Sequence, residues 1–386
     1  GNAALGEGRI ADAADCYRRA TEADPADPLA RVNLGYALLE QADPAAAVEP
    51  LERAIGLGAP GAGHLPDAWF LLARAQRDLG RTAQAVDSFT EALRCRAAFP
   101  EALHELVLLL QTLGRHVEAL PWAQRLAAVR PSAAAGLLLA QELHYTGQAP
   151  AALEVLDELI AADPGNTGAM TGRGHVLLRL GRFDDAIAAF RLALQREGPQ
   201  PDRLVDLAGA LQRAGQFEEG IRLHEQALAL APGHAGAWNL RVHALIAQLR
   251  LPEAAAMARQ AIALHPDDAD LHWNLGIACM LQGRWREGWA EHGWRWRSSD
   301  ALAGAPVRRP EPAWRGEPLQ GRRLVLVAEQ GLGDTLQFAR YVPLLAASAR
   351  EVELQAPTSL HRLLRGLAPN LRVTDAAPAA GDVHCA

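Results

Sequence analysis

The chain has 386 residues and a net charge of −7, from 38 basic and 45 acidic side chains. Every basic side chain is arginine, and lysine is absent from the sequence. Phosphate-loop NTPases, protein kinases and Schiff-base enzymes all need a lysine amine, so the sequence excludes these three classes. A hydrophobic content of 49% is ordinary for a folded protein.

Cysteine and histidine usage gives no sign of a metal or disulfide framework. The cysteines lie far apart, without a C-x-x-C pair, which favours reduced thiols; they are Cys16, Cys95, Cys279 and Cys385. The 13 histidines show no metal-binding spacing, so we expect no metal site. No apolar run approaches the roughly 20 residues of a membrane span, and no signal peptide opens the chain. We therefore expect a cytoplasmic protein.

A short phrase recurs through the first three quarters of the chain. "LGRTAQAVDSFTEAL" from Leu79, "LGRFDDAIAAFRLAL" from Leu180 and "AGQFEEGIRLHEQALALAP" from Ala214 share a glycine followed by small and large apolar residues at fixed offsets. The glycines recur at about 34 residues or twice that: Gly80, Gly114, Gly147, Gly181, Gly215 and Gly283. Prolines end the units, namely Pro25, Pro131, Pro164, Pro232 and Pro266.

This period predicts stacked helical hairpins. Each glycine allows the tight turn between two helices, and each proline ends the second helix. Small residues let the helices of a hairpin touch: Ala85, Ala119, Ala152, Ala186, Gly220 and Ala254. Large residues are expected to fill the gap to the next hairpin: Phe89, Leu156 and Phe190. One hairpin cannot bury its apolar face alone, so the units must stack.

We count a half unit at residues 1–27 and eight fuller units to about residue 297. The segment "GLGAPGAGHLP" near residues 55–66 reads as a longer loop between units. In the unit that begins at Ala235, Leu249 stands where the turn glycine is expected. The fold class predicted for residues 1–300 is an α/α superhelical solenoid.

These features resemble the tetratricopeptide repeat (TPR) family. The resemblance implies a scaffold whose concave groove, lined by the first helix of each unit, holds a protein or peptide. The family register places these side chains in the groove: Asn33, Tyr36, Phe70, Arg74, His104, Gln141, His175, Asn239, His243, Trp273 and Asn274. Groove asparagines hydrogen-bond a peptide backbone, but other residues interrupt the ladder here: Leu71, Glu105, Leu138 and Asp206. For any single groove residue, an ordinary polar residue on a solvated helix face is the favoured interpretation.

The first 300 residues carry 28 arginines and 37 acidic residues, a net charge of −9. Because nucleic-acid binding requires a basic stripe, we expect no nucleic-acid partner. The last unit is rich in tryptophan, with Trp285, Trp289, Trp294 and Trp296 close together. We expect these rings to cap the open end of the solenoid and to join it to the C-terminal segment, rather than to stack on bases. A proline-rich connector is predicted at residues 301–322.

From residue 323 to 386 the pattern changes to alternating strands and helices. Strands are predicted at Leu324–Ala328, Glu351–Ala356 and near Leu371, with helices from about Thr335 and from about Thr358. This order is the start of a parallel, doubly wound sheet, a short and incomplete Rossmann-like α/β segment. The loop Gln330, Gly331, Gly333 and Thr335 lies after the first strand, where such sheets bind anionic ligands. Asp334 in this loop could cap the next helix.

The stretch "WRGEPLQGRRLVLVAEQGLGDTLQFARYVPLL" looks like the junction in bacterial proteins that join TPR repeats to a two-Rossmann (GT-B) glycosyltransferase domain. The motif "GLGD" is also similar to the start of glycosyltransferase family nine, the heptosyltransferases. That resemblance implies a catalytic role for Asp334 as general base, which is chemically sensible for a carboxylate at a sheet edge. It implies a nucleotide sugar as donor substrate, and no further cofactor. A GT-B enzyme needs a second half, so the chain as given is expected to be inactive alone.

Together these features predict a TPR scaffold that presents a protein to a glycosyltransferase-like domain. Two alternatives stay open: a non-enzymatic scaffold in which the α/β segment is a structural cap, and an enzyme acting on lipid-linked sugars in which the repeats set localisation or oligomerisation. A homo-oligomer is compatible with any of the three. Neither the donor sugar nor the acceptor follows from the residues.

Overall fold

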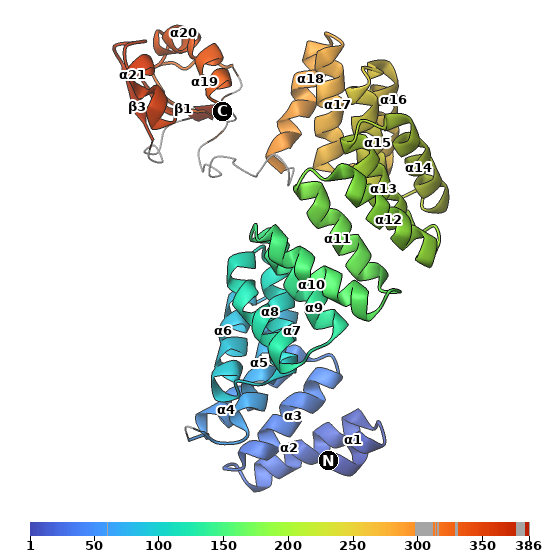
Figure 1. The fold of residues 1–386 in the computed structure, drawn as a ribbon. Helices are drawn as coiled ribbons and strands as arrows, with labels where there is room; N and C mark the ends of the chain where they lie inside the picture. Colours follow the sequence, from blue (N-terminus) through green and yellow to red (C-terminus); the bar gives the residue numbers. More distant parts are fainter. Residues whose placement is uncertain are drawn as a thin grey trace. The chain divides into compact units, whose positions relative to one another are not determined.

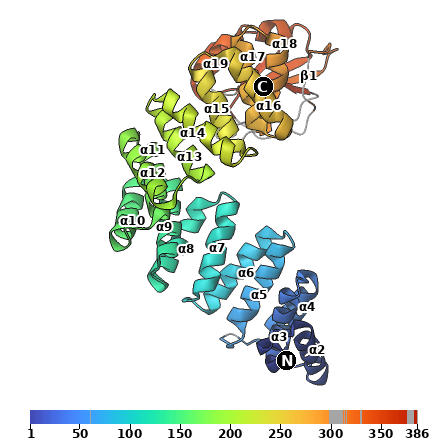
Figure 2. The ribbon, with the colours of Figure 1, turned by 90° about the vertical axis from the view of Figure 1, so that its right-hand side faces the viewer.

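The computed structural model describes residues 1–59, 61–297, 312, 314, 316–328, 331–375 and 383–385. The chain divides into two compact units, residues 1–220 and residues 221–386. Figures 1 and 2 show the helices of both units and the small sheet near the C-terminus. Among the described residues, no helix has the length and apolar character needed to cross a membrane.

The first unit is built from consecutive helical hairpins. It opens with the short α1 (Asn2–Gly6) and α2 (Ile10–Ala23), in the segment where the half unit is predicted. The helices after α2 pack in sequential pairs: α3 (Pro28–Glu40), α4 (Pro44–Gly56), α5 (Leu65–Asp78), α6 (Thr82–Cys95), α7 (Pro100–Thr112), α8 (His116–Val129), α9 (Ala133–Tyr145), α10 (Ala149–Ala162), α11 (Thr167–Arg179), α12 (Phe183–Glu197) and α13 (Pro201–Arg213). The insertion near residue 60 is the loop between α4 and α5, as predicted.

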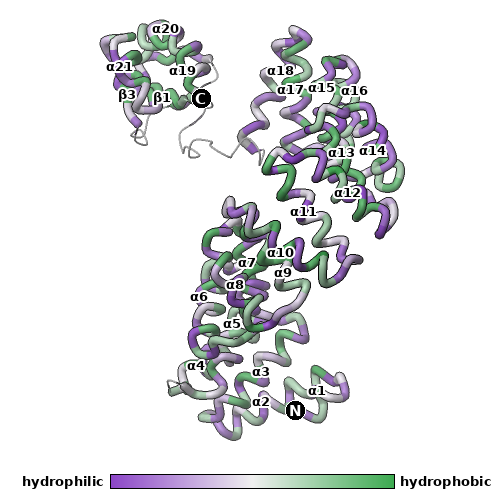
Figure 3. The backbone as a smooth tube through the Cα atoms, viewed as in Figure 1, coloured by the Kyte–Doolittle hydropathy of each residue, from purple (hydrophilic) through white to green (hydrophobic). Residues whose placement is uncertain are grey.

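Helix α14 (Phe217–Leu230) begins in the first unit and continues into the second. The remaining repeats are α15 (Ala235–Ala247) with α16 (Leu251–Leu264), and α17 (Ala269–Leu281) with α18 (Trp285–His292) and the 3₁₀ turn η1 (Gly293–Arg297). The predicted mostly α fold, a solenoid of helical hairpins, is therefore confirmed, and the number of units stays a prediction. Hydrophobic and hydrophilic stretches alternate along the helices (Figure 3), as expected for helices that bury one face.

The turn inside each hairpin has one recurring geometry. Gly80, like the other predicted turn glycines, has a positive φ, and the values at these positions lie between 68° and 82°. At this turn Arg81 N–H donates to the Gln76 carbonyl at 2.8 Å. This six-residue closure is a Schellman motif, which satisfies helix-end carbonyls and requires a left-handed residue. The glycine period in the sequence is therefore the period of this turn.

Leu249 occupies the same left-handed turn position with φ 58°, although its side chain is 72% exposed and contributes little burial. A non-glycine residue has a steric penalty of about 1–2 kcal/mol in this conformation, partly offset by its lower entropy in the unfolded chain. We expect Leu249→Gly to raise the free energy of unfolding by about 0.5–1 kcal/mol.

Urea denaturation followed by circular dichroism would measure this change. Leu264→Gly is the matched control, because Leu264 is also an exposed leucine but lies in the last turn of α16. There glycine should lower stability by about 0.5–1 kcal/mol. A loss of stability in both variants would show that the turn at Leu249 carries no strain.

Small residues allow close contact within each hairpin. The alanines predicted at these contacts, such as Ala85 and Ala186, are fully buried. A Cβ atom placed on Gly174 of α11 would lie 2.5 Å from the ring of Phe190 in α12. Phe190 therefore packs against the first helix of its own hairpin, and its predicted packing in the gap to the next hairpin stays a prediction. In the last hairpin, a Cβ on Gly276 would lie 2.8 Å from the backbone nitrogen of His292.

His224 of α14 is fully buried, and its pKa is lowered to about 4, first because burial disfavours the imidazolium and then because Arg241 and His234 are nearby charges. In the unfolded chain this imidazole binds a proton near pH 6.5. Lowering the pH from 7 to 5 therefore protonates the unfolded state and not the folded one, which costs about 2 kcal/mol of stability. We expect His224→Leu to remove this part of the acid sensitivity.

The measurement is urea unfolding of both proteins at pH 7 and pH 5. The wild type should lose about 2 kcal/mol more than the variant between the two pH values. An equal loss in both would mean that other groups carry the acid sensitivity.

In the described part of the C-terminal segment, four strands form a parallel sheet with the order β3-β2-β1-β4. Its strands are β1 (Arg323–Val327), β2 (Glu351–Gln355), β3 (Leu371–Thr374) and β4 (Val383–Cys385). The first three were predicted, whereas β4 was not. Apolar residues of the sheet pack with α19 (Leu332–Ala339), α20 (Val342–Ala346), η2 (Thr358–Leu360) and α21 (His361–Leu364).

Two expectations for this segment need correction. The helix after β1 begins at Leu332 rather than near Thr335, and the helix predicted from Thr358 is a 3₁₀ turn followed by one helical turn. Part of the predicted connector also packs against the sheet. Trp314 and Leu319 pack in a core cluster with residues of the sheet, and the Trp314 backbone N–H donates to the His384 carbonyl at 2.7 Å. Most of the remaining connector lies outside the described residues.

Candidate functional site

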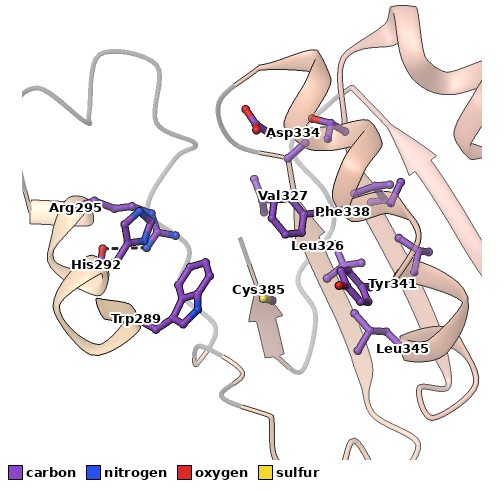
Figure 4. Close-up of a pocket in the computed structure, with 15 residues that line it drawn as sticks. Trp289, His292, Arg295, Leu326, Val327, Asp334, Phe338, Tyr341, Leu345 and Cys385 are labelled. Atoms are coloured by element: carbon purple, nitrogen blue, oxygen red, sulfur yellow. Dashed lines mark hydrogen bonds between the residues drawn. The ribbon is translucent and has the colours of Figure 1, made fainter. Parts of the chain in front are cut away.

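A cavity of about 420 Å³ lies at the carboxyl ends of β1 and β4. Val327 and Ala328 line it at the end of β1, and Cys385 lines it at the end of β4 (Figure 4). Strand β2 pairs with one side of β1 and β3 pairs with the far side of β2, whereas β4 pairs with the other side of β1. The strand order therefore reverses at this cavity, and such reversal points are where open parallel sheets bind ligands.

Asp334 lies on the wall of this cavity. Gly331 precedes the first residue of α19, and its N–H donates to Asp334 Oδ2 at 3.4 Å. The hydroxyl of Thr335 donates to the Gly331 carbonyl at 3.1 Å. Gly333, Asp334 and Thr335 are therefore residues of the first helical turn, not of a loop, and Asp334 caps the helix from inside it. Gln330, the remaining residue predicted for this loop, lies outside the described residues.

Two aromatic residues come after Asp334 on the same wall of the cavity. Phe338 is 52% exposed and Tyr341 is 45% exposed, and their ring centroids lie 6.3 Å apart. The guanidinium of Arg340 lies 4.9 Å from the Tyr341 ring centroid and donates to the Tyr341 hydroxyl at 3.2 Å. Sequence reasoning missed these residues, although the letters "LQFARY" directly after "GLGD" carry the signal.

The last repeat supplies three further lining residues, Trp289, His292 and Arg295. Figure 4 labels all three. Arg295 Nη1 donates to the His292 carbonyl at 3.2 Å, and the Trp289 and His292 rings meet edge to face with centroids 5.4 Å apart.

The tryptophans of this repeat differ in their packing. Trp294 stacks on His272 of α17 with centroids 4.0 Å apart, so it covers the end of the repeats as predicted. Trp285 and Trp289 are 60% and 56% exposed. Trp289 lines the cavity together with residues of the sheet, and the predicted role of these two rings in joining the repeats to the C-terminal segment stays a prediction.

In the first unit, the predicted groove residues lie on the first helices of their hairpins. Asn33 is half-buried and Tyr36 is exposed. Arg74 lies 3.8 Å from the Glu40 carboxylate of the preceding repeat. Phe70 is half-buried between Phe89 and Phe99, with ring centroids 5.9 and 5.0 Å away. This phenylalanine therefore contributes to the core of its repeat.

The remaining predicted groove residues of this unit are two histidines and a glutamine. His175 pairs with Asp206 of the next repeat at 2.9 Å, and its ring meets Phe190 edge to face. Gln141 is exposed and His104 is half-buried. The structure thus brings His175 and Asp206 together, although Asp206 was expected only as a break in the asparagine ladder.

In the second unit, the predicted asparagines contact each other. Asn274 Nδ2 donates to Asn239 Oδ1 at 3.3 Å, and Asn239 Nδ2 donates to Asp268 at 3.3 Å. Trp273 is half-buried and His243 is exposed. These side chains form a short polar ladder across two repeats. Among the described residues, no group of three His, Cys, Asp or Glu side chains is placed to hold a metal ion.

A family model for the tetratricopeptide repeat matches residues 1–62, 70–134, 137–201 and 240–288, more than half of the chain. The chain belongs to the tetratricopeptide repeat family. Solved TPR structures agree in fold. A TPR protein from Parabacteroides merdae aligns with a TM-score of 0.56 at 17% identity, covering 65% of this chain and 98% of that one. The C-terminal part of a TPR repeat-containing protein from Cytophaga hutchinsonii aligns with a TM-score of 0.50 at 12% identity, over 61% and 96% of the two chains.

Two curated relatives share part of the TPR chain's sequence. Protein FlbA of Caulobacter vibrioides is 33% identical over 177 residues, which is 43% of this chain and 28% of that protein. Human protein O-mannosyl-transferase TMTC1 is 27% identical over 221 residues, 56% of this chain and 25% of that protein. The chain therefore spans about a quarter of the length of each relative.

Proposed function

We propose that this TPR protein is a scaffold that presents a protein to its α/β segment, and that in the full-length protein this segment transfers a sugar from a nucleotide sugar. The cavity at the strand reversal carries the enzymatic part of the proposal, because it combines a carboxylate with aromatic walls at the edge where parallel sheets bind ligands. The similarity of part of the chain to a protein O-mannosyl-transferase also supports sugar transfer to a protein.

In this proposal Asp334 is the general base. Its carboxylate lies at the cavity wall, where it would take the proton from an attacking hydroxyl. The Gly331 N–H that it accepts fixes its orientation at the start of α19. The ligand's anionic groups would be bound by arginine and backbone amides, since the sequence contains no lysine.

The scaffold part rests on the predicted groove residues of each unit, which together we call the first-helix face. They are Asn33, Tyr36, Phe70, Arg74, His104, Gln141 and His175 in the first unit, and Asn239, His243, Trp273 and Asn274 in the second. Amide side chains on this face offer both donors and acceptors to a peptide backbone. The Asn274–Asn239–Asp268 ladder holds such amides in fixed positions. The partner is therefore proposed to be a protein or peptide bound in extended form.

A second function is favoured by one observation. The hydrogen bond from Gly331 to Asp334 is a helix cap, and capping alone is sufficient to account for a carboxylate at this position. In that case the protein is a non-enzymatic scaffold, and the α/β segment covers the end of the repeats.

The scaffold role is tested with peptides selected against the chain from a random display library. Binding of these peptides is measured by fluorescence polarisation for a variant with Asn33, Arg74, Asn239 and Asn274 changed to alanine. The control changes four exposed residues of second helices, Arg18, Arg94, Glu154 and Gln260, to alanine. We expect the first variant to lose at least about tenfold in affinity and the control to bind normally. Normal binding by both would place the peptide on another surface.

A further inference from the structure

The cavity at the sheet edge has walls from two segments of the second unit. One wall is built from β1, β4, α19 and α20, and the other from Trp289, His292 and Arg295 of the last repeat (Figure 4). Among the described residues that line it, Arg295 carries the permanent positive charge and Asp334 the carboxylate. Charge of opposite sign on its two walls suits a ligand that has both an anionic group and hydroxyl groups.

Arginine is the one permanent side-chain cation that this chain uses, because lysine is absent. A guanidinium has five N–H donors in a planar fork that matches phosphate oxygens. Arg295 Nη1 donates to the His292 carbonyl at 3.2 Å, which ties its side chain to the last residue of α18 at the cavity. Arg295 therefore combines a permanent positive charge, N–H donors that match phosphate oxygens, and a side chain held at the cavity.

Each of the two walls also carries a large, exposed aromatic ring. Trp289 is 56% exposed on one wall, and Phe338 is 52% exposed on the other. Large exposed rings in a cavity favour contact with the flat, apolar face of a ring-shaped ligand. Trp285 provides an internal comparison, because it is 60% exposed one helical turn earlier and is not among the described residues that line the cavity.

We propose that the last repeat forms one wall of the ligand site, in which Arg295 binds the anionic group and Trp289 contacts the ring. The ligand class is a phosphorylated sugar, either a nucleotide sugar or a sugar phosphate without a nucleoside. This inference rests on the proposed function, and it adds that the repeats contribute directly to the sugar site. Removing the repeats would then remove part of that site.

Isothermal titration calorimetry of the full chain with three probes tests the proposal: uridine diphosphate glucose, glucose 1-phosphate and methyl glucoside. Arg295→Gln should weaken binding of the phosphorylated probes by about tenfold or more, and Arg295→Lys should restore part of the loss because it keeps the charge. Trp289→Ser should weaken binding by about threefold to tenfold. Methyl glucoside, which has no anionic group, should respond to Trp289→Ser and not to Arg295→Gln.

The matched controls are Arg297→Gln and Trp285→Ser. Arg297 lies over the Trp294 ring in the same 3₁₀ turn, and neither control residue is among the described residues lining the cavity. Both controls should bind the probes as the wild type does. Stronger binding of the nucleotide sugar than of glucose 1-phosphate would identify the nucleotide sugar as the ligand, and equal binding would identify the sugar phosphate.

Wild-type affinity in Arg295→Gln, or an equal loss in Arg295→Gln and Arg297→Gln, would overturn the role of the last repeat and leave the proposed function standing. A wild-type chain that binds neither phosphorylated probe would overturn this inference together with sugar-donor binding by the chain. Peptide binding to the first-helix face is measured separately, so the scaffold part of the proposed function is judged independently.

Discussion

Phe190→Ala is expected to lower the free energy of unfolding of its repeats by about 3–5 kcal/mol, the usual cost of removing a buried phenylalanine ring. Phe190 is 1% exposed and lies against Gly174 of the same hairpin. Hydrogen exchange of the α11 and α12 amides in the full chain would measure the effect locally. This readout is needed because repeat arrays do not always unfold in a single step.

A double-mutant cycle identifies the contact responsible. A Cβ on Gly174 would lie 2.5 Å from the Phe190 ring, so Gly174→Ala should cost about 1–3 kcal/mol in the wild type through overpacking. In the Phe190→Ala background that conflict is gone, and the same change should stabilise α11 by up to about 1 kcal/mol. Additive effects of the two changes would contradict direct packing between these residues.

Asp334→Asn is expected to lower sugar transfer by the full-length protein by about 10²–10⁴-fold, because asparagine cannot accept the proton of an attacking hydroxyl. Asparagine keeps the size of the side chain and an oxygen that accepts the Gly331 N–H. The measurement is the initial rate of labelled sugar transfer, with circular dichroism as the check on folding.

Glu351→Gln is the control for this variant. Glu351 begins β2, so it is a carboxylate at the opposite, amino-terminal edge of the same sheet, and its loss should leave the rate unchanged. An Asp334→Asn protein as active as the wild type would remove Asp334 as the base. Its role would then be limited to capping α19.

The repeat array could be predicted because one local requirement recurs. Each hairpin turn needs a left-handed residue, so glycine appears at that position about every 34 residues. Leu249 shows the limit of this signal, since the turn forms with the same geometry and a leucine in the glycine position. Here the packing of α15 against α16 determines the turn, although leucine has no local preference for the left-handed conformation.

The sheet was less predictable for reasons of length and context. Strand β4 has three residues and is stabilised by its partners, β1 on one side and the backbones of Pro312 and Trp314 on the other, so its own sequence gives no periodic signal. The start of α19 depends on the bond from Gly331 to Asp334, which propensity does not reveal. The cavity walls join residues far apart in the sequence, such as Trp289 and Asp334, and only the tertiary structure brings them to one site.

The most direct test of the proposed function is labelled sugar transfer to protein by the full-length protein, measured together with hydrolysis of the nucleotide sugar. The acceptors are proteins extracted from the source organism. If the first-helix face presents the acceptor, the variant with Asn33, Arg74, Asn239 and Asn274 changed to alanine should lose protein labelling and still hydrolyse the donor at the wild-type rate. Wild-type labelling of proteins by that variant, or no labelling by the wild type with any nucleotide sugar, would contradict the proposed function.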